Sequence, residues 1–129
     1  MLRSPHAHAT FTINTGAARG MPGIAAILTA EDTKDLGGLP CLFNLEDHPF
    51  TGPDYPILAA KEVRHVGDAI AFIVAETVEQ ARDAIEAIEV DWKPLPSVNG
   101  LTNAVAKGAP QVWDKHPGNV LFDVPIGDK

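Results

Sequence analysis

Cysteine and basic residues are both scarce in this sequence of 129 residues. A single cysteine, Cys41, excludes a disulfide within the chain and any cluster of thiolates. Lys and Arg number 10 against 17 Asp and Glu, so the formal net charge is −7. Because nucleic acids and anionic membranes attract an excess of Lys and Arg, this composition argues against both partners.

Long apolar runs are also missing. The longest, "AIAFIVA" at residues 69–75, has the length of a strand and falls well short of the roughly 18 to 20 residues that cross a membrane as a helix. The start "MLRSPHAH" lacks the apolar core of a signal peptide. Because a single cysteine is also compatible with a reducing compartment, we expect a cytoplasmic location.

The clearest structural pattern predicts a strand, a helix and a second strand. Residues 69–75 indicate a strand that is covered on both faces and central in its sheet. Thr77 and Gln80 have the spacing of a capping box, so a helix should begin there. Its apolar stripe would comprise Val78, Ala81, Ala84, Ile85 and Ile88. A strand within 88–96 should follow, with Val90 and Trp92 on one face. A right-handed crossover would make the two strands parallel, with space for an added strand between them.

The remaining segments complete a compact α/β pattern. Residues 10–14 alternate as a half-buried strand does, and 24–30 form a second apolar strand after a helical turn near 17–19. A helical turn or loop follows at 30–38, and residues 37–56 predict a long irregular excursion with a short strand near 41–43. Residues 99–110 suit a turn and a short helix, and 119–129 an extended segment. The predicted fold class is α/β (α+β), a mixed sheet with packed helices in one globular domain.

Gly67-Asp68 is the first candidate for chemistry. A phosphate-binding loop places glycines between a strand and the following helix, where backbone amides can bind an anion. Here the glycine precedes the strand, and the strand-to-helix segment "AETVEQ" contains no glycine. We therefore interpret Gly67-Asp68 as a turn or bulge that leads the chain into the sheet.

The pair His6 and His8 is the second candidate. Two residues apart on a strand, both imidazoles would face one side and could share a zinc ion. Further ligands would have to come from Cys41, His48, His65 or carboxylates elsewhere in the chain. The spacing favours hydrogen-bonded or interfacial histidines over a metal site.

Three further groups of residues have weaker signals. Glu46, Asp47 and His48 adjoin on the long loop, where sequence neighbours seldom reach the geometry of a general base. Cys41 is predicted to be a buried, inert thiol. Trp92 and Trp113 are expected in the core or on a docking surface. The residues alone therefore assign no catalytic, cofactor-binding or metal-binding position.

Four ordered blocks carry a resemblance to a known family. They are "RSPHAHA" at 3–9, "MPGIAAILTAED" at 21–32, "VRHVGDAIAFIVAET" at 63–77 and "ARDAIEAIEVDWKPLP" at 81–96. Together they resemble the α/β hammerhead domain of the molybdenum-binding large subunit of xanthine dehydrogenase, aldehyde oxidase and aerobic carbon monoxide dehydrogenase type enzymes. The tail "PGNVLFDVPIGD" is similar to the segment that leads from this domain into the molybdenum-binding part.

The resemblance implies a domain of a molybdenum hydroxylase whose chemistry takes place elsewhere. In that family a molybdopterin cofactor inserts oxygen from water, and electrons leave through iron–sulfur and flavin centres. The cofactor-binding segments and the catalytic base lie downstream of this domain, so no site residue is carried over. Residues 1–98 would form the hammerhead domain, truncated at its N-terminus relative to the family, and 99–129 an extended linker toward the molybdenum-binding domain.

Partners follow from the same resemblance. They would be the molybdenum-binding domains of the same subunit and the iron–sulfur and FAD subunits, and the isolated chain should be an inactive scaffold. A sheet edge left unpaired by the truncation would invite self-association. The alternative is a free-standing interaction or small-ligand module that uses the 37–56 loop, where Phe43, Phe50 and Tyr55 offer apolar contacts.

Overall fold

The computed structural model describes residues 1–40, 52, 55–121, 123, 124 and 127. The chain divides into two compact units. The first comprises Met1–Gly37 and Pro56–Leu95, and the second comprises Gly38–Tyr55 and Pro96–Lys129. None of the helices in the described part of the chain is long and apolar enough to cross a membrane.

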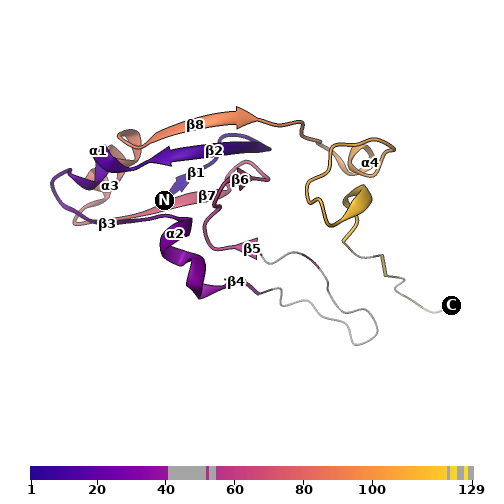
Figure 1. Cartoon of the computed structure of the whole chain (residues 1–129), viewed down its shortest axis with the longest axis horizontal. Coiled ribbons are helices and arrows are strands. Elements are labelled where there is room, and N and C mark those ends of the chain that lie inside the picture. Colours follow the sequence, from indigo (N-terminus) through magenta and orange to yellow (C-terminus); the bar gives the residue numbers. More distant parts are fainter. Residues whose placement is uncertain (41–51, 53–54, 122, 125–126, 128–129) are drawn as a thin grey trace. The chain divides into compact units, whose positions relative to one another are not determined.

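The first sheet of the first unit has the strand order β1-β7-β3 (Figure 1). It consists of β1 (Leu2–Arg3), β7 (Ala69–Ala75) and β3 (Ile24–Leu28), and β7 pairs antiparallel with both neighbours. The β3–β7 register sets Ile27 opposite Ile73 and Leu28 opposite Phe72. The central position predicted for residues 69–75 is confirmed.

The second sheet has the order β6-β2-β8 and is also antiparallel. It contains β6 (Glu62–Val63), β2 (Ala9–Asn14) and β8 (Glu89–Pro94). β2 and β8 run side by side (Figure 1). Their register sets Phe11 opposite Trp92 and Ile13 opposite Val90.

The prediction that the strands before and after the helix run parallel in one sheet is therefore wrong. The α/β (α+β) class with packed helices is confirmed, and the strand pairs of both sheets are antiparallel. The right-handed crossover rule applies to two strands of one sheet, whereas here the helix carries the chain from one sheet into the other. β8 instead matches its alternating apolar face to that of β2 over six residue pairs.

Helix α3 (Val78–Glu86) connects the two sheets and begins at the predicted capping box. The backbone N–H of Gln80 donates to Thr77 Oγ1 at 3.2 Å, and Thr77 N–H donates to Gln80 Oε1 at 3.0 Å. Ala84 is fully buried, as its place in the apolar stripe predicts. Val78 is 61% exposed, so its assignment to the buried stripe is wrong: it stands in the first helical turn, outside the packed core.

Three short helical segments accompany the sheets. They are α1 (Gly16–Arg19), α2 (Ala30–Thr33) and the 3-10 helix η1 (Lys34–Leu36). Both α1 and α2 confirm the helical turns expected at these places. The side chain of Asp32 accepts the N–H of Thr29 at 2.8 Å and so caps the first turn of α2.

Two apolar clusters form the core of the first unit. The first contains Ala18, Ile27, Ala71, Ile73, Ala84 and Ile88, and the second contains Ala9, Phe11, Ala59, Val63 and Ile70. Strand β7 thus contributes to both clusters. It is not buried along both faces, because Phe72 and Val74 remain 43% and 39% exposed. The prediction of a strand covered on both faces is wrong for these two residues.

The second unit contains α4 (Leu101–Ala104), which confirms the short helix expected in 99–110, and the 3-10 helix η2 (Pro117–Asn119). Its Asn119 side chain makes three hydrogen bonds: Nδ2 donates to the carbonyls of Ala104 and Pro110 at 2.9 Å each, and Oδ1 accepts from Val112 N at 2.8 Å. Strand β4 (Gly38–Leu39) pairs with β5 (Tyr55–Pro56). The strand expected near 41–43 lies outside the described residues.

Candidate functional site

The turn at Gly67-Asp68 fastens the N-terminal strand to the first sheet. Gly67 N donates to the carbonyl of Ser4 at 2.8 Å, and Ser4 N donates to the carbonyl of Asp68 at 2.8 Å. Arg3 Nη1 donates to the carbonyl of Gly67 at 2.7 Å. Gly67 has φ +96°, a conformation that glycine adopts without strain. The prediction that a turn at Gly67-Asp68 leads the chain into the sheet is confirmed.

The carboxylate of Asp68 serves this turn as well. Asp68 is 6% exposed, and its Oδ2 accepts a hydrogen bond from the backbone N of Arg64 at 2.9 Å. His65 Nδ1 lies 3.7 Å from the same oxygen. The carboxylate satisfies a backbone amide that would otherwise lose its bond to water, so its contacts explain its burial without a ligand.

The two histidines of "HAH" have different surroundings. The ring of His6 packs against Trp92 with centroids 5.1 Å apart, and Trp92 packs in turn against Phe11 at 5.3 Å. His8 Nε2 forms a hydrogen bond with Glu62 Oε1 at 2.7 Å. The expectation of hydrogen-bonded histidines is confirmed for His8. Trp92, expected in the core or on a docking surface, is partly buried and packs against the second core cluster.

Glu62 links His8 to a further side chain. Its second oxygen, Oε2, lies 3.1 Å from Arg64 Nη2, so one carboxylate holds both a ring nitrogen and a guanidinium. All three side chains are partly buried beside the second sheet. Within the described residues no group of three or more His, Cys, Asp and Glu side chains could hold a metal ion. Cys41 and His48, two of the conceivable further ligands, lie outside that part of the chain.

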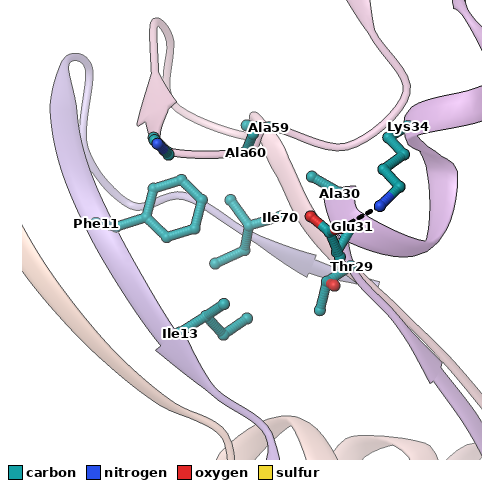
Figure 2. Close-up of a pocket in the computed structure, with 10 residues that line it drawn as sticks. Phe11, Ile13, Thr29, Ala30, Glu31, Lys34, Ala59, Ala60 and Ile70 are labelled. Atoms are coloured by element: carbon teal, nitrogen blue, oxygen red, sulfur yellow. Dashed lines mark hydrogen bonds and ion pairs between the residues drawn. The ribbon is translucent and has the colours of Figure 1, made fainter.

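A cavity of about 280 Å³ opens in the first unit (Figure 2). Its apolar floor is formed by Phe11, Ile13 and Ile70, which point into it from β2 and β7. Its rim is formed by Thr29, Ala30, Glu31 and Lys34 around α2 and by residues 59–61. The volume lies just under the roughly 300 to 1,000 Å³ that is typical of small-molecule sites. Sequence patterns missed this cavity because three distant segments build it.

Charged side chains on the rim of this cavity pair with each other within α2 and η1. Lys34 Nζ forms an ion pair with Glu31, drawn as a dashed line in Figure 2, and this hydrogen bond raises the pKa of Lys34 above its ordinary value. Next to it, hydrogen bonds from the backbone and then the hydroxyl of Thr29 lower the pKa of Asp32. These charges favour a solvated rim around an apolar floor.

The start of α3 does not offer a binding site for the phosphate of a molybdenum cofactor. A phosphate would need free amides at the start of a helix such as α3, but there the Gln80 amide is already bonded to Thr77 Oγ1. Gly23, whose carbonyl accepts from Glu76 N beside this helix start, does not leave space for a phosphate either, because the carboxamide of Gln80 occupies the position of a Cβ on it. Glu46, Asp47, His48, Cys41, Phe43 and Phe50 lie outside the described residues.

Comparisons with known proteins identify the family to which this fold belongs. Residues 1–96 match the family model described as "Aldehyde oxidase and xanthine dehydrogenase, a/b hammerhead domain". The carbon monoxide dehydrogenase large chain of Afipia carboxidovorans is 37% identical, over 99% of this chain and 17% of its own length. The aldehyde oxidoreductase of Megalodesulfovibrio gigas is 33% identical, over 98% of this chain and 14% of its own length.

A solved structure has the same fold. Quinoline 2-oxidoreductase from Pseudomonas putida 86 superposes with a TM-score of 0.83 at 32% identity, covering 94% of this chain and 15% of that chain. The chain thus spans less than a fifth of the length of these relatives: 17% of the carbon monoxide dehydrogenase chain and 12% of a probable hypoxanthine oxidase of Escherichia coli O157:H7.

Proposed function

The chain belongs to the aldehyde oxidase and xanthine dehydrogenase a/b hammerhead family, and from this premise we propose that it is a scaffold domain in the large subunit of a molybdenum hydroxylase. The observation that carries the proposal is the match of residues 1–96 to that domain, together with the small share of each relative that the chain covers. The oxidation of a substrate then takes place on other parts of the enzyme.

The side-chain contacts of the described residues support a scaffold. The carboxylate of Asp68 accepts a hydrogen bond from the backbone of Arg64. The carboxylate of Glu62 contacts the side chains of His8 and Arg64. A catalytic base instead needs an accessible lone pair within reach of the substrate proton. These carboxylates hold strands and turns together, which is the work of a structural domain.

The partners belong to the same proposal. Residues 1–98 act as the hammerhead domain, and residues 99–129 lead toward the molybdenum-binding domain of the same subunit. Iron–sulfur and FAD subunits complete the electron path, and the whole enzyme works in the cytoplasm. The molybdopterin cofactor is held by the molybdenum-binding part, and the isolated chain is inactive.

Elemental analysis of the chain in two forms tests the proposal. An affinity tag on the chain is used to purify it from its native host, and molybdenum per chain is measured by elemental mass spectrometry beside the recombinant 129-residue chain. We expect close to stoichiometric molybdenum in the native preparation and none in the recombinant chain. Native material without molybdenum, or a recombinant chain that binds molybdenum and oxidises aldehydes or purines, would show the proposal to be wrong.

A further inference from the structure

One face of the first sheet carries large apolar side chains in contact with water. Leu28 on β3 is the direct cross-strand partner of Phe72 on β7, and Ala26 is the partner of Val74. Since paired residues share a face, these side chains form one surface. Leu28, Phe72 and Val74 are 36%, 43% and 39% exposed. We call this surface, Ala26, Leu28, Phe72 and Val74, the β3–β7 face.

The opposite face of the same strands is buried in the core. Ile27, Ala71 and Ile73 point to that side and are at most 7% exposed, because they pack in the first core cluster with Ala84 and Ile88. The exposure of the β3–β7 face is therefore not a general property of a small sheet. It marks one side of the sheet that the described residues of the first unit leave uncovered.

On the β3–β7 side, the part of β7 that other side chains bury ends at Ile70. Ile70 lies on the same face of β7 as Phe72, two residues away, yet it is only 1% exposed because Phe11 and Val63 of the second core cluster pack over it. Beyond Ile70 this cluster stops and Phe72 is exposed. An apolar surface that passes directly from core to solvent is typical of an interface whose partner is missing.

A shallow groove lies where the end of β7 meets the first turn of α3, and its lining includes Phe72 and Val74 of this face together with Ile73 and Ala75. It has a volume of about 320 Å³ and runs from Phe72 and Val74 to Val78 and Ala81. Val78, in the first turn of α3, is 61% exposed. Of the residues that line the groove, Glu76 is the one that carries a charge. Few charged residues at the centre of an interface are characteristic of permanent complexes, whereas the interfaces of transient complexes are more polar.

We propose that the β3–β7 face, with Val78, is the surface on which the molybdenum-binding part of the large subunit docks. This inference rests on the proposed function, because it takes the docking partner to be another part of the same large subunit. Relatives contain several times the length of this chain, so an apolar partner of sufficient area is part of the enzyme itself. A partner that stays bound for the life of the enzyme suits a face that water solvates poorly.

Thiol labelling in the assembled enzyme tests the docking surface. Phe72→Cys and Val74→Cys report on the face, and Glu86→Cys, an exposed position on α3, is the matched control; all carry Cys41→Ser to remove the native thiol. Each variant is purified from the native host by a tag, and also as the recombinant 129-residue chain. Maleimide labelling is followed by the mass of the proteolytic peptide that contains each introduced cysteine, so that thiols elsewhere in the enzyme do not count, and circular dichroism checks the fold of each recombinant variant.

We expect the thiols at positions 72 and 74 to react at least about tenfold more slowly in the molybdenum-containing enzyme than in the recombinant chain, since labelling then requires the interface to open. The control at position 86 should react at similar rates in both. Equal rates at 72 and 74 in a preparation that contains molybdenum would overturn the docking surface and leave the proposed function intact. Native material without molybdenum would overturn both.

A second copy of the chain is the competing occupant. β3 is an edge strand of its sheet, and an edge invites pairing with another chain. If the recombinant chain alone protects positions 72 and 74 and shows a doubled mass by light scattering, the face is a homodimer contact and the proposal is overturned. A monomeric recombinant chain with reactive thiols supports it.

Discussion

Replacing Gly23 by alanine should destabilise the first unit more than an ordinary turn glycine does. Gly23 has φ +77°, and its Cβ position is occupied by the carboxamide of Gln80. That carboxamide accepts from Thr77 N at 3.0 Å and so completes the capping box of α3. The carbonyl of Gly23 also accepts from Glu76 N at 2.9 Å, which holds the start of α3 beside this turn.

The expected cost has two parts. A left-handed alanine costs roughly 1 to 2 kcal/mol. The displaced Gln80 side chain loses its half of the capping box, which adds about 1 kcal/mol. The sum is roughly 2 to 3 kcal/mol, and for a chain of this size it lowers the melting temperature by about 10 °C. Thermal and urea unfolding followed by circular dichroism would measure both quantities.

Two further variants isolate the contact with Gln80. Gly67→Ala is the matched control, because Gly67 has φ +96° but no atom near its Cβ position, so it should show only the backbone cost of roughly 1 to 2 kcal/mol. In a Gln80→Ala background the cap is already lost, so Gly23→Ala should cost about 1 kcal/mol less than in the wild type. If Gly23→Ala costs the same in both backgrounds, the contact with Gln80 does not matter and the reasoning is refuted.

Three other substitutions test separate features. Gly67→Val should destabilise the protein by about 1 kcal/mol or more through its positive φ, and an unchanged melting temperature would count against this. Asn119→Ala removes three hydrogen bonds of the second unit, so the amide of Val112 should exchange with deuterium faster, and unchanged protection would contradict the role of Asn119. The lowered pKa of Asp32, caused mainly by hydrogen bonds from Thr29, predicts stability that is present above the ordinary pKa of 3.8 and is lost as the pH falls through the lower folded-state value. Asp32→Ala should be less stable at neutral pH and lose less in acid, which acid titrations of both proteins by circular dichroism would measure.

Features that depend on neighbours in the sequence were predictable. The capping box of α3 needs only Thr77 and Gln80, three residues apart, and the structure contains it as predicted. The turn at Gly67 was predictable for the same reason, since a glycine before an apolar run commonly marks a change of backbone direction. The capping box and the turn depend on residues that are close in the sequence, so the residue types at these positions are sufficient to predict them.

Pairing between distant segments was not predictable in the same way. The sequence pattern suggested that the strands flanking α3 run parallel in one sheet, but β8 pairs with β2, about eighty residues away in the chain. The cavity of Figure 2 likewise joins Phe11, Ile70 and Lys34 from three segments. A local pattern says that a side chain is apolar but not which other apolar face will cover it.

The sequence by itself determined the family, the start of α3 and the turn at Gly67-Asp68, because ordered blocks and local spacing carry that information. Only the tertiary structure decided which apolar positions are buried. Ile70 and Phe72 are alike in the sequence pattern and lie on the same face of one strand, yet one is 1% exposed and the other 43%. The difference arises because burial depends on packing across the chain, and Phe11 and Val63 reach Ile70 and end before Phe72.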